Sequence, residues 1–149
     1  MAAKLTLEGT FAFRFVGFDR ADTHACTVAG VGIVKLTLDP GKQSGTLTGT
    51  QFVTNSPMSG QATNLDNTTY SLSGDFTIDD SGPPILATSN IVFTQGEGPG
   101  RKLSDQFAIV QTGPDRLSVI SKKPHDEIRN KDVQELVSGE MIKVDPATW

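Results

Sequence analysis

Residues 9–18 read Gly-Thr-Phe-Ala-Phe-Arg-Phe-Val-Gly-Phe and set a pattern that returns along the chain. Phe11, Phe13 and Phe15 occupy every second position, which is the side-chain period of a β-strand. A helix would distribute the three rings around its axis. We therefore expect a strand here, with its phenylalanines on the buried face.

The same alternation recurs between short segments that are rich in glycine and proline. In residues 67–78, large apolar side chains alternate with serine, aspartate and threonine, which is typical of a strand with one buried face. The pattern predicts strands over residues 5–18, 24–38 (or 26–38), 44–54, 67–78, 86–95, 103–112, 116–122 and 133–144. Residues 124–132 are charged and are expected to form a short loop or helix, and residues 145–149 a C-terminal tail.

About eight antiparallel strands with short turns, and no helix long enough for a parallel crossover, predict an all-β fold in a single domain over residues 1–149. A closed up-and-down barrel would leave no unpaired strand edge. Glycines inside the strand patterns allow the bends that closure needs. We expect an eight-stranded antiparallel up-and-down β-barrel, with a β-sandwich as the alternative.

Charge and hydropathy limit the partners. The net charge is −4 and the 13 lysines and arginines are scattered, whereas a nucleic-acid interface needs a concentrated basic face. No apolar run approaches the ~20 residues that span a bilayer, and the N-terminus lacks the apolar segment of a signal peptide. We expect no nucleic-acid or membrane partner and a soluble, cytoplasmic protein, with a mature secreted form as the alternative.

Cysteine and histidine are too few for a metal centre of the common kind. Cys26 is the single cysteine, so no internal disulfide can form, and with only His24 and His125 a closed Cys/His zinc shell cannot be filled. His24 and Cys26 stand two apart on one predicted strand, ~7 Å from each other, which is poor geometry for a nucleophile and its base. We expect no metal site, no cofactor and no catalytic residue.

Short motifs follow one another in a recognisable order: Gly9-Thr10-Phe11, Val31-Gly32, Leu47-Thr48-Gly49, Tyr70-x-Leu72-x-Gly74-x-Phe76 and Ser138-Gly139-Glu140. This order resembles a group of uncharacterised bacterial all-β proteins, and the layout is more distantly similar to the calycins, the lipocalins and avidins. The resemblance implies a small barrel with an internal cavity and transfers no catalytic residue. Lipocalins and avidins have tryptophan where this chain has Phe11, and its one tryptophan is Trp149, so biotin binding is not implied.

The residues in phase with the first three phenylalanines would form the wall of a ligand cavity. The candidate ligand-binding residues are Phe11, Phe13, Phe15, Gln51, Tyr70, Phe76, Phe93, Asp105 and Phe107. The rings would give an apolar, aromatic wall, and the few polar groups would orient a ligand. For each polar group the alternative is a solvent-wetted position at the end of the barrel. A small barrel can also be filled entirely by its own side chains.

Arg14 is out of phase with the phenylalanines, so we expect it on the outer face, with its stem covering apolar surface. The alternative is a buried arginine paired with Asp105 or Glu140.

Because no catalytic motif stands out, we expect a non-enzymatic barrel that binds a small apolar or aromatic molecule. One alternative is a cofactor-independent cyclase or isomerase, resembling the allene oxide cyclase type of barrel, with Arg14, Tyr70, Asp105 and Glu140 as its polar groups. Another is a structural protein that forms a homo-oligomer through an apolar outer strip, which comprises Ala29, Val31 and Ile33.

Overall fold

The computed structural model describes residues 7–21, 24–57, 66–95, 101–121, 125–126, 131–132 and 134–145. Its strands are β1 (Gly9–Ala21), β2 (His24–Leu38), β3 (Ser44–Pro57), β4 (Asp66–Asp79), β5 (Ile85–Thr94), β6 (Arg101–Gly113), β7 (Arg116–Ser121), β8 (His125–Asp126), β9 (Lys131–Asp132) and β10 (Gln134–Val144). No helix in this part of the chain is long and apolar enough to cross a membrane.

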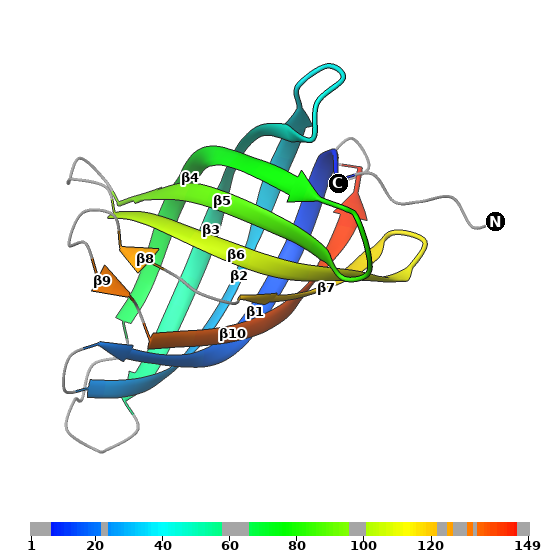
Figure 1. Ribbon diagram of the computed structural model, residues 1–149. Helices are drawn as coiled ribbons and strands as arrows, with labels where there is room; N and C mark the ends of the chain where they lie inside the picture. Colours follow the sequence, from blue (N-terminus) through cyan, green and yellow to red (C-terminus); the bar gives the residue numbers. More distant parts are fainter. Residues whose placement is uncertain are drawn as a thin grey trace.

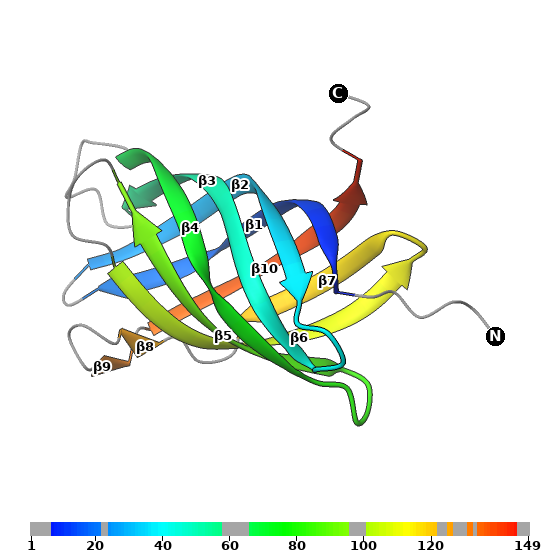
Figure 2. The same ribbon diagram turned by 90° about the horizontal axis from the view of Figure 1, so that it is seen from above.

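Eight of the strands close into a barrel (Figure 1). Each pairs antiparallel with its neighbours, in the order β5-β4-β3-β2-β1-β10-β7-β6, and the pairing of β5 with β6 closes the ring. The view along a second direction shows the same strands wrapped around a common interior (Figure 2). The predicted eight-stranded up-and-down barrel is confirmed, and the sandwich alternative is wrong because one continuous sheet closes on itself.

The two short strands β8 and β9 lie where the sequence predicted a loop or helix. β6 spans 13 residues and its neighbour β7 only 6, so the first part of β6 extends past the end of β7. β8 pairs with that part of β6, and β9 pairs with β8. An open strand edge is a ready template for further pairing, which explains strands that have no sequence pattern of their own. The rest of segment 124–132 lies outside the described residues.

Alternation along the strands separates the interior from the outer face. On β4, Leu72 and Phe76 are buried, whereas Ser73 and Thr77 are exposed. Removing apolar side chains from water is the main driving force for this arrangement. The buried apolar residues form one cluster: Leu7, Phe11, Val34, Leu36, Leu47, Leu72, Phe76, Ala87, Ile109 and Leu117.

Two glycines of β2 make room for the aromatic side chains of β1. Gly30 pairs with Phe15, and Gly32 pairs with Phe13. A Cβ atom at Gly30 would overlap the Phe15 ring, and one at Gly32 would lie 2.5 Å from the Phe13 ring. The two rings stack on each other with centroids 6.4 Å apart. The aromatic side chains therefore cover the bare backbone of β2, a cross-strand contact that helps to fix register.

Candidate functional site

The barrel contains a cavity of about 230 Å³, and all eight barrel strands contribute to its wall. Protein interiors rarely hold voids larger than one water molecule, whose share of liquid volume is about 30 Å³. The wall is largely apolar and aromatic; Phe13, Phe15, Leu47, Ile91 and Phe107 are examples. Since an apolar cavity of about 150 Å³ is enough to bind benzene, this interior has room for a small organic molecule.

Seven of the nine residues that the sequence nominated for the cavity line it: Phe13, Phe15, Gln51, Phe76, Phe93, Asp105 and Phe107. The other two lie inside the barrel but not in the cavity wall. Phe11 is 0% exposed and belongs to the core. Tyr70 is half-buried and contacts Phe93 edge to face, with ring centroids 6.1 Å apart. The alternation predicts which way a side chain points, but not whether it meets the cavity or packed neighbours.

A small polar spot interrupts the apolar wall where β5, β6 and β7 adjoin. Asp105 is only 9% exposed, and one of its carboxylate oxygens accepts a hydrogen bond of 2.5 Å from the Ser121 hydroxyl. Ser89 lies opposite Asp105 in the pairing of β5 with β6. Both serines are 2% exposed, and both line the cavity. The spot places a buried carboxylate next to two buried hydroxyls.

The two serines have different hydrogen-bonding states. Ser121 donates to the Asp105 carboxylate, whereas the Ser89 hydroxyl has no hydrogen-bond partner in the described structure. Neither serine was among the candidate ligand-binding residues predicted from the sequence, because those candidates were chosen among aromatic and larger polar side chains. The signal was available: Ser89 follows Ala87 by two residues, and Ser121 follows Val119 by two, so each shares the inward phase of its strand.

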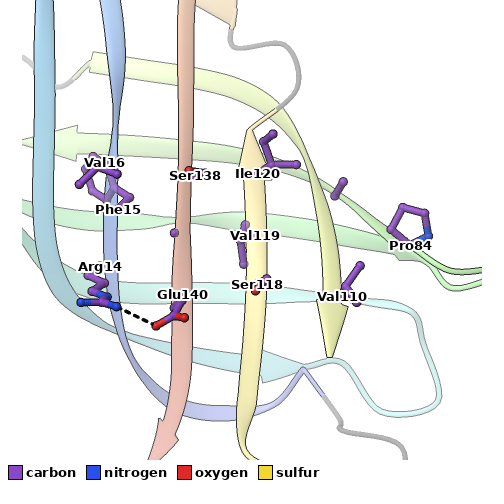
Figure 3. A pocket seen from close by; sticks show the side chains of 12 residues that line it. Arg14, Phe15, Val16, Pro84, Val110, Ser118, Val119, Ile120, Ser138 and Glu140 are labelled. Carbon is purple, nitrogen blue, oxygen red and sulfur yellow. Dashed lines mark hydrogen bonds and ion pairs between the residues drawn. The ribbon is translucent and has the colours of Figure 1, made fainter. Parts of the chain in front are cut away.

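The outer face carries a second, wider hollow of about 790 Å³ across β1, β10, β7 and β6 (Figure 3). Arg14 and Glu140 are direct partners in the pairing of β1 with β10, and their side chains form an ion pair of 3.2 Å. Because the Arg14 side chain is 73% exposed, this pair belongs to the surface, where ion pairs contribute little to stability. The prediction that Arg14 lies outside is correct, and its carboxylate partner lies outside with it.

Apolar side chains line the same hollow as this ion pair. Val16 is 63% exposed, and Val110 and Ile120 of the same hollow are exposed as well. The exposed large apolar residues of the described chain are Val16, Phe18, Val31, Phe52, Val110, Ile120, Leu136 and Ile142. They lie on β1, β2, β3, β6, β7 and β10, which are consecutive in the barrel. Of the predicted outer strip, Val31 is exposed, and Ala29 and Ile33 are half-buried.

The polar groups proposed for a cyclase or isomerase do not converge on one point. The side chains of Arg14 and Glu140 pair on the outer face, although both residues also border the cavity that Asp105 lines, and Tyr70 lies inside the barrel but not in the cavity wall. Within the described ranges no group of three or more histidines, cysteines, aspartates and glutamates is close enough to hold a metal ion. The side chains of His24 and Cys26, and the tail after Asp145, lie outside the described part of the chain.

Comparison with known proteins identifies no family. No family model matches the sequence, and no curated protein matches it. Among solved structures, an S-type phycobiliprotein lyase from Guillardia theta matches with a TM-score of 0.39 and 9% sequence identity. The match covers 93% of this chain and 89% of that protein. A similarity of this size identifies neither a ligand nor a reaction for this chain.

Proposed function

We propose that this protein is a non-enzymatic barrel that binds a small apolar or aromatic molecule in its interior. The observation that carries the proposal is the cavity of about 230 Å³ inside a closed barrel with a mostly apolar wall. Ligand sites of this kind combine a hydrophobic wall with a few placed polar groups. The aromatic wall and the polar spot at Ser89, Asp105 and Ser121 supply both components.

The volume of the cavity limits the size of the ligand. Sites for drug-sized molecules measure about 300–1,000 Å³, and this cavity is smaller. The interior suits one aromatic ring with a short substituent, or a short alkyl chain.

The test is a pair of identical substitutions on one strand. Val34 of β2 is 7% exposed and lines the cavity, whereas Val31 of the same strand is 55% exposed on the outer face. Val34→Phe should fill the cavity and abolish the binding of ethylbenzene, measured by NMR titration. Val31→Phe should bind like the parent protein. If Val34→Phe does not fold, Ile91→Phe fills the same cavity from β5. Loss of binding in Val31→Phe alone would place the site outside the barrel and refute the proposal.

A second candidate function is self-association through the outer face. Monomeric proteins rarely expose contiguous apolar patches of large size. The charges on this outer face are complementary to those of a second copy of the chain. A twofold axis beside the ion pair would bring Arg14 of one copy to Glu140 of the other. Val16→Glu should shift the protein to monomer in sedimentation equilibrium. Thr88→Glu, exposed on β5 across the barrel, should not. A monomeric parent protein at high concentration would remove this candidate.

A further inference from the structure

The Ser89 hydroxyl is the one buried side-chain polar atom without a hydrogen bond in the described structure. It lies in the cavity wall on a residue that is 2% exposed, so bulk water does not reach it freely. Native proteins leave few such groups unsatisfied, and each one calls for an explanation. Because Ser89 is one of the residues that line the cavity, its hydroxyl is explained if a group of the ligand is its hydrogen-bond partner.

The neighbouring carboxylate narrows the chemistry of that partner. Asp105 faces Ser89 directly across the β5–β6 pair, where opposed side chains have Cβ atoms about 4.5–5.5 Å apart. A carboxyl oxygen accepts hydrogen bonds, and one oxygen of Asp105 already accepts one from Ser121. A ligand group next to it is favoured if it donates a hydrogen bond, whereas a ligand carboxylate is disfavoured because two carboxylates at one site do not both ionise easily.

The rest of the wall fixes how the ligand lies. The polar spot is formed by adjoining strands, whereas the stacked rings of Phe13 and Phe15 cover β2. Gln51 is the other uncharged polar side chain of the inward phase in the wall, and it lies on β3, away from β5 and β6 in the barrel. One end of a bound ligand would therefore contact the Ser89 hydroxyl and the Asp105 carboxylate, and the rest of the ligand would contact apolar side chains.

We propose that the cavity takes an amphipathic molecule whose polar end is an alcohol or amine, and that this end binds the Ser89 hydroxyl beside Asp105. The inference rests on the proposed function, because it names the chemical class of ligand for the same cavity. A ligand hydroxyl can bond to both neighbours at once, since it can accept a hydrogen bond from Ser89 and donate one to Asp105. A ligand carboxylate would share the site with a second carboxyl group, so one of the two would have to stay protonated.

The experiment uses three probes of similar size that differ in the polar end: benzyl alcohol, ethylbenzene and benzoate. Their affinities are measured by NMR titration for the parent protein, for Ser89→Ala, and for Ser73→Ala as a control on an exposed serine of β4. Ser89→Ala should weaken benzyl alcohol about tenfold, the value of one hydrogen bond, and leave ethylbenzene unchanged. Ser73→Ala should change neither affinity, and benzoate should be the weakest probe throughout.

The outcomes separate this inference from the proposed function. One outcome is that ethylbenzene and benzyl alcohol both bind while Ser89→Ala changes neither affinity, or changes both by the same factor. That result would refute the hydrogen bond between the ligand and Ser89 and would leave the apolar binding cavity supported. If benzoate binds the parent protein more tightly than benzyl alcohol, the assigned ligand class is refuted. If no probe binds the interior, the inference falls together with the proposed function.

Discussion

Replacing Ser89 and Ser121 separately by alanine should change the free energy of unfolding in opposite directions. The two residues are matched: both are serines, both are 2% exposed, and both line one cavity. They differ in one respect, because Ser121 donates a hydrogen bond to Asp105 and the Ser89 hydroxyl has no partner in the described structure. The comparison therefore isolates the effect of an unsatisfied buried hydroxyl.

The expected sizes follow from that difference. An unsatisfied buried polar group costs about 1–3 kcal/mol, and alanine at Ser89 removes it while leaving the wall otherwise intact. The ligand-free Ser89→Ala protein should be about 1 kcal/mol more stable. Removing the Ser121 hydroxyl takes a donor from the buried Asp105 carboxyl group, a loss that costs about 1–3 kcal/mol, so Ser121→Ala should be about 2 kcal/mol less stable. At ~2–4 °C per kcal/mol for a chain of this size, the two melting temperatures should differ by roughly 6–12 °C.

Urea denaturation followed by circular dichroism measures both values, after any co-purified ligand has been extracted. The m-value should stay the same in all three proteins, because neither substitution changes the surface exposed on unfolding. Destabilisation of similar size by both substitutions would contradict this expectation, because it would mean that the Ser89 hydroxyl has a hydrogen-bond partner.

Two further predictions concern local structure. Gly30→Ala should lower the free energy of unfolding by about 1–3 kcal/mol, because the added methyl group would overlap the aromatic ring beside it. Gly82→Ala, where nothing lies within 4 Å, is the control, and equal effects at the two glycines would show that no ring covers β2. In the turn after β4, two hydrogen bonds from Ser81 lower the pKa of Asp79 below 3.8. The bond from the Ser81 side chain has the larger effect on the pKa, and the bond from the Ser81 backbone N–H, 3.0 Å long, has the smaller one. Stability from this contact is complete above the ordinary pKa and is lost as the pH falls through the lowered value. Ser81→Ala should return the pKa of Asp79 toward 3.8 in a carboxyl NMR titration, and an unchanged pKa would contradict the contact.

The fold was predictable because the alternation that specifies it is local. Each strand carries its own two-residue pattern, and β4 shows it over nearly its full length. Closure was an inference from strand number and edge protection, and the β5–β6 pairing confirms it. The pairs β6–β8 and β8–β9 could not be predicted, because they depend on how far β6 extends past β7 in the assembled barrel.

The sequence was sufficient to predict which side chains of the candidate site point inward, but not which neighbours they contact. The phase of Phe11 and Phe13 is identical, yet one is fully buried in the core and the other lines the cavity. Ser89 and Ser121 also share the inward phase, but only the diagonal geometry between strands decides which hydroxyl reaches Asp105. Such contacts join residues on different strands, and no periodicity within one strand contains them.

Binding of an apolar ligand inside this protein requires that the closed barrel hold an accessible apolar interior. Xenon binds in dry apolar cavities, so anomalous diffraction from crystals pressurised with xenon tests the claim directly. A xenon peak is expected inside the barrel, bounded by Phe13, Leu47 and Ile91. The same measurement on Val34→Phe should lose that peak. Xenon found only in the outer hollow beside Val16, or nowhere in the molecule, would contradict an interior that receives a ligand.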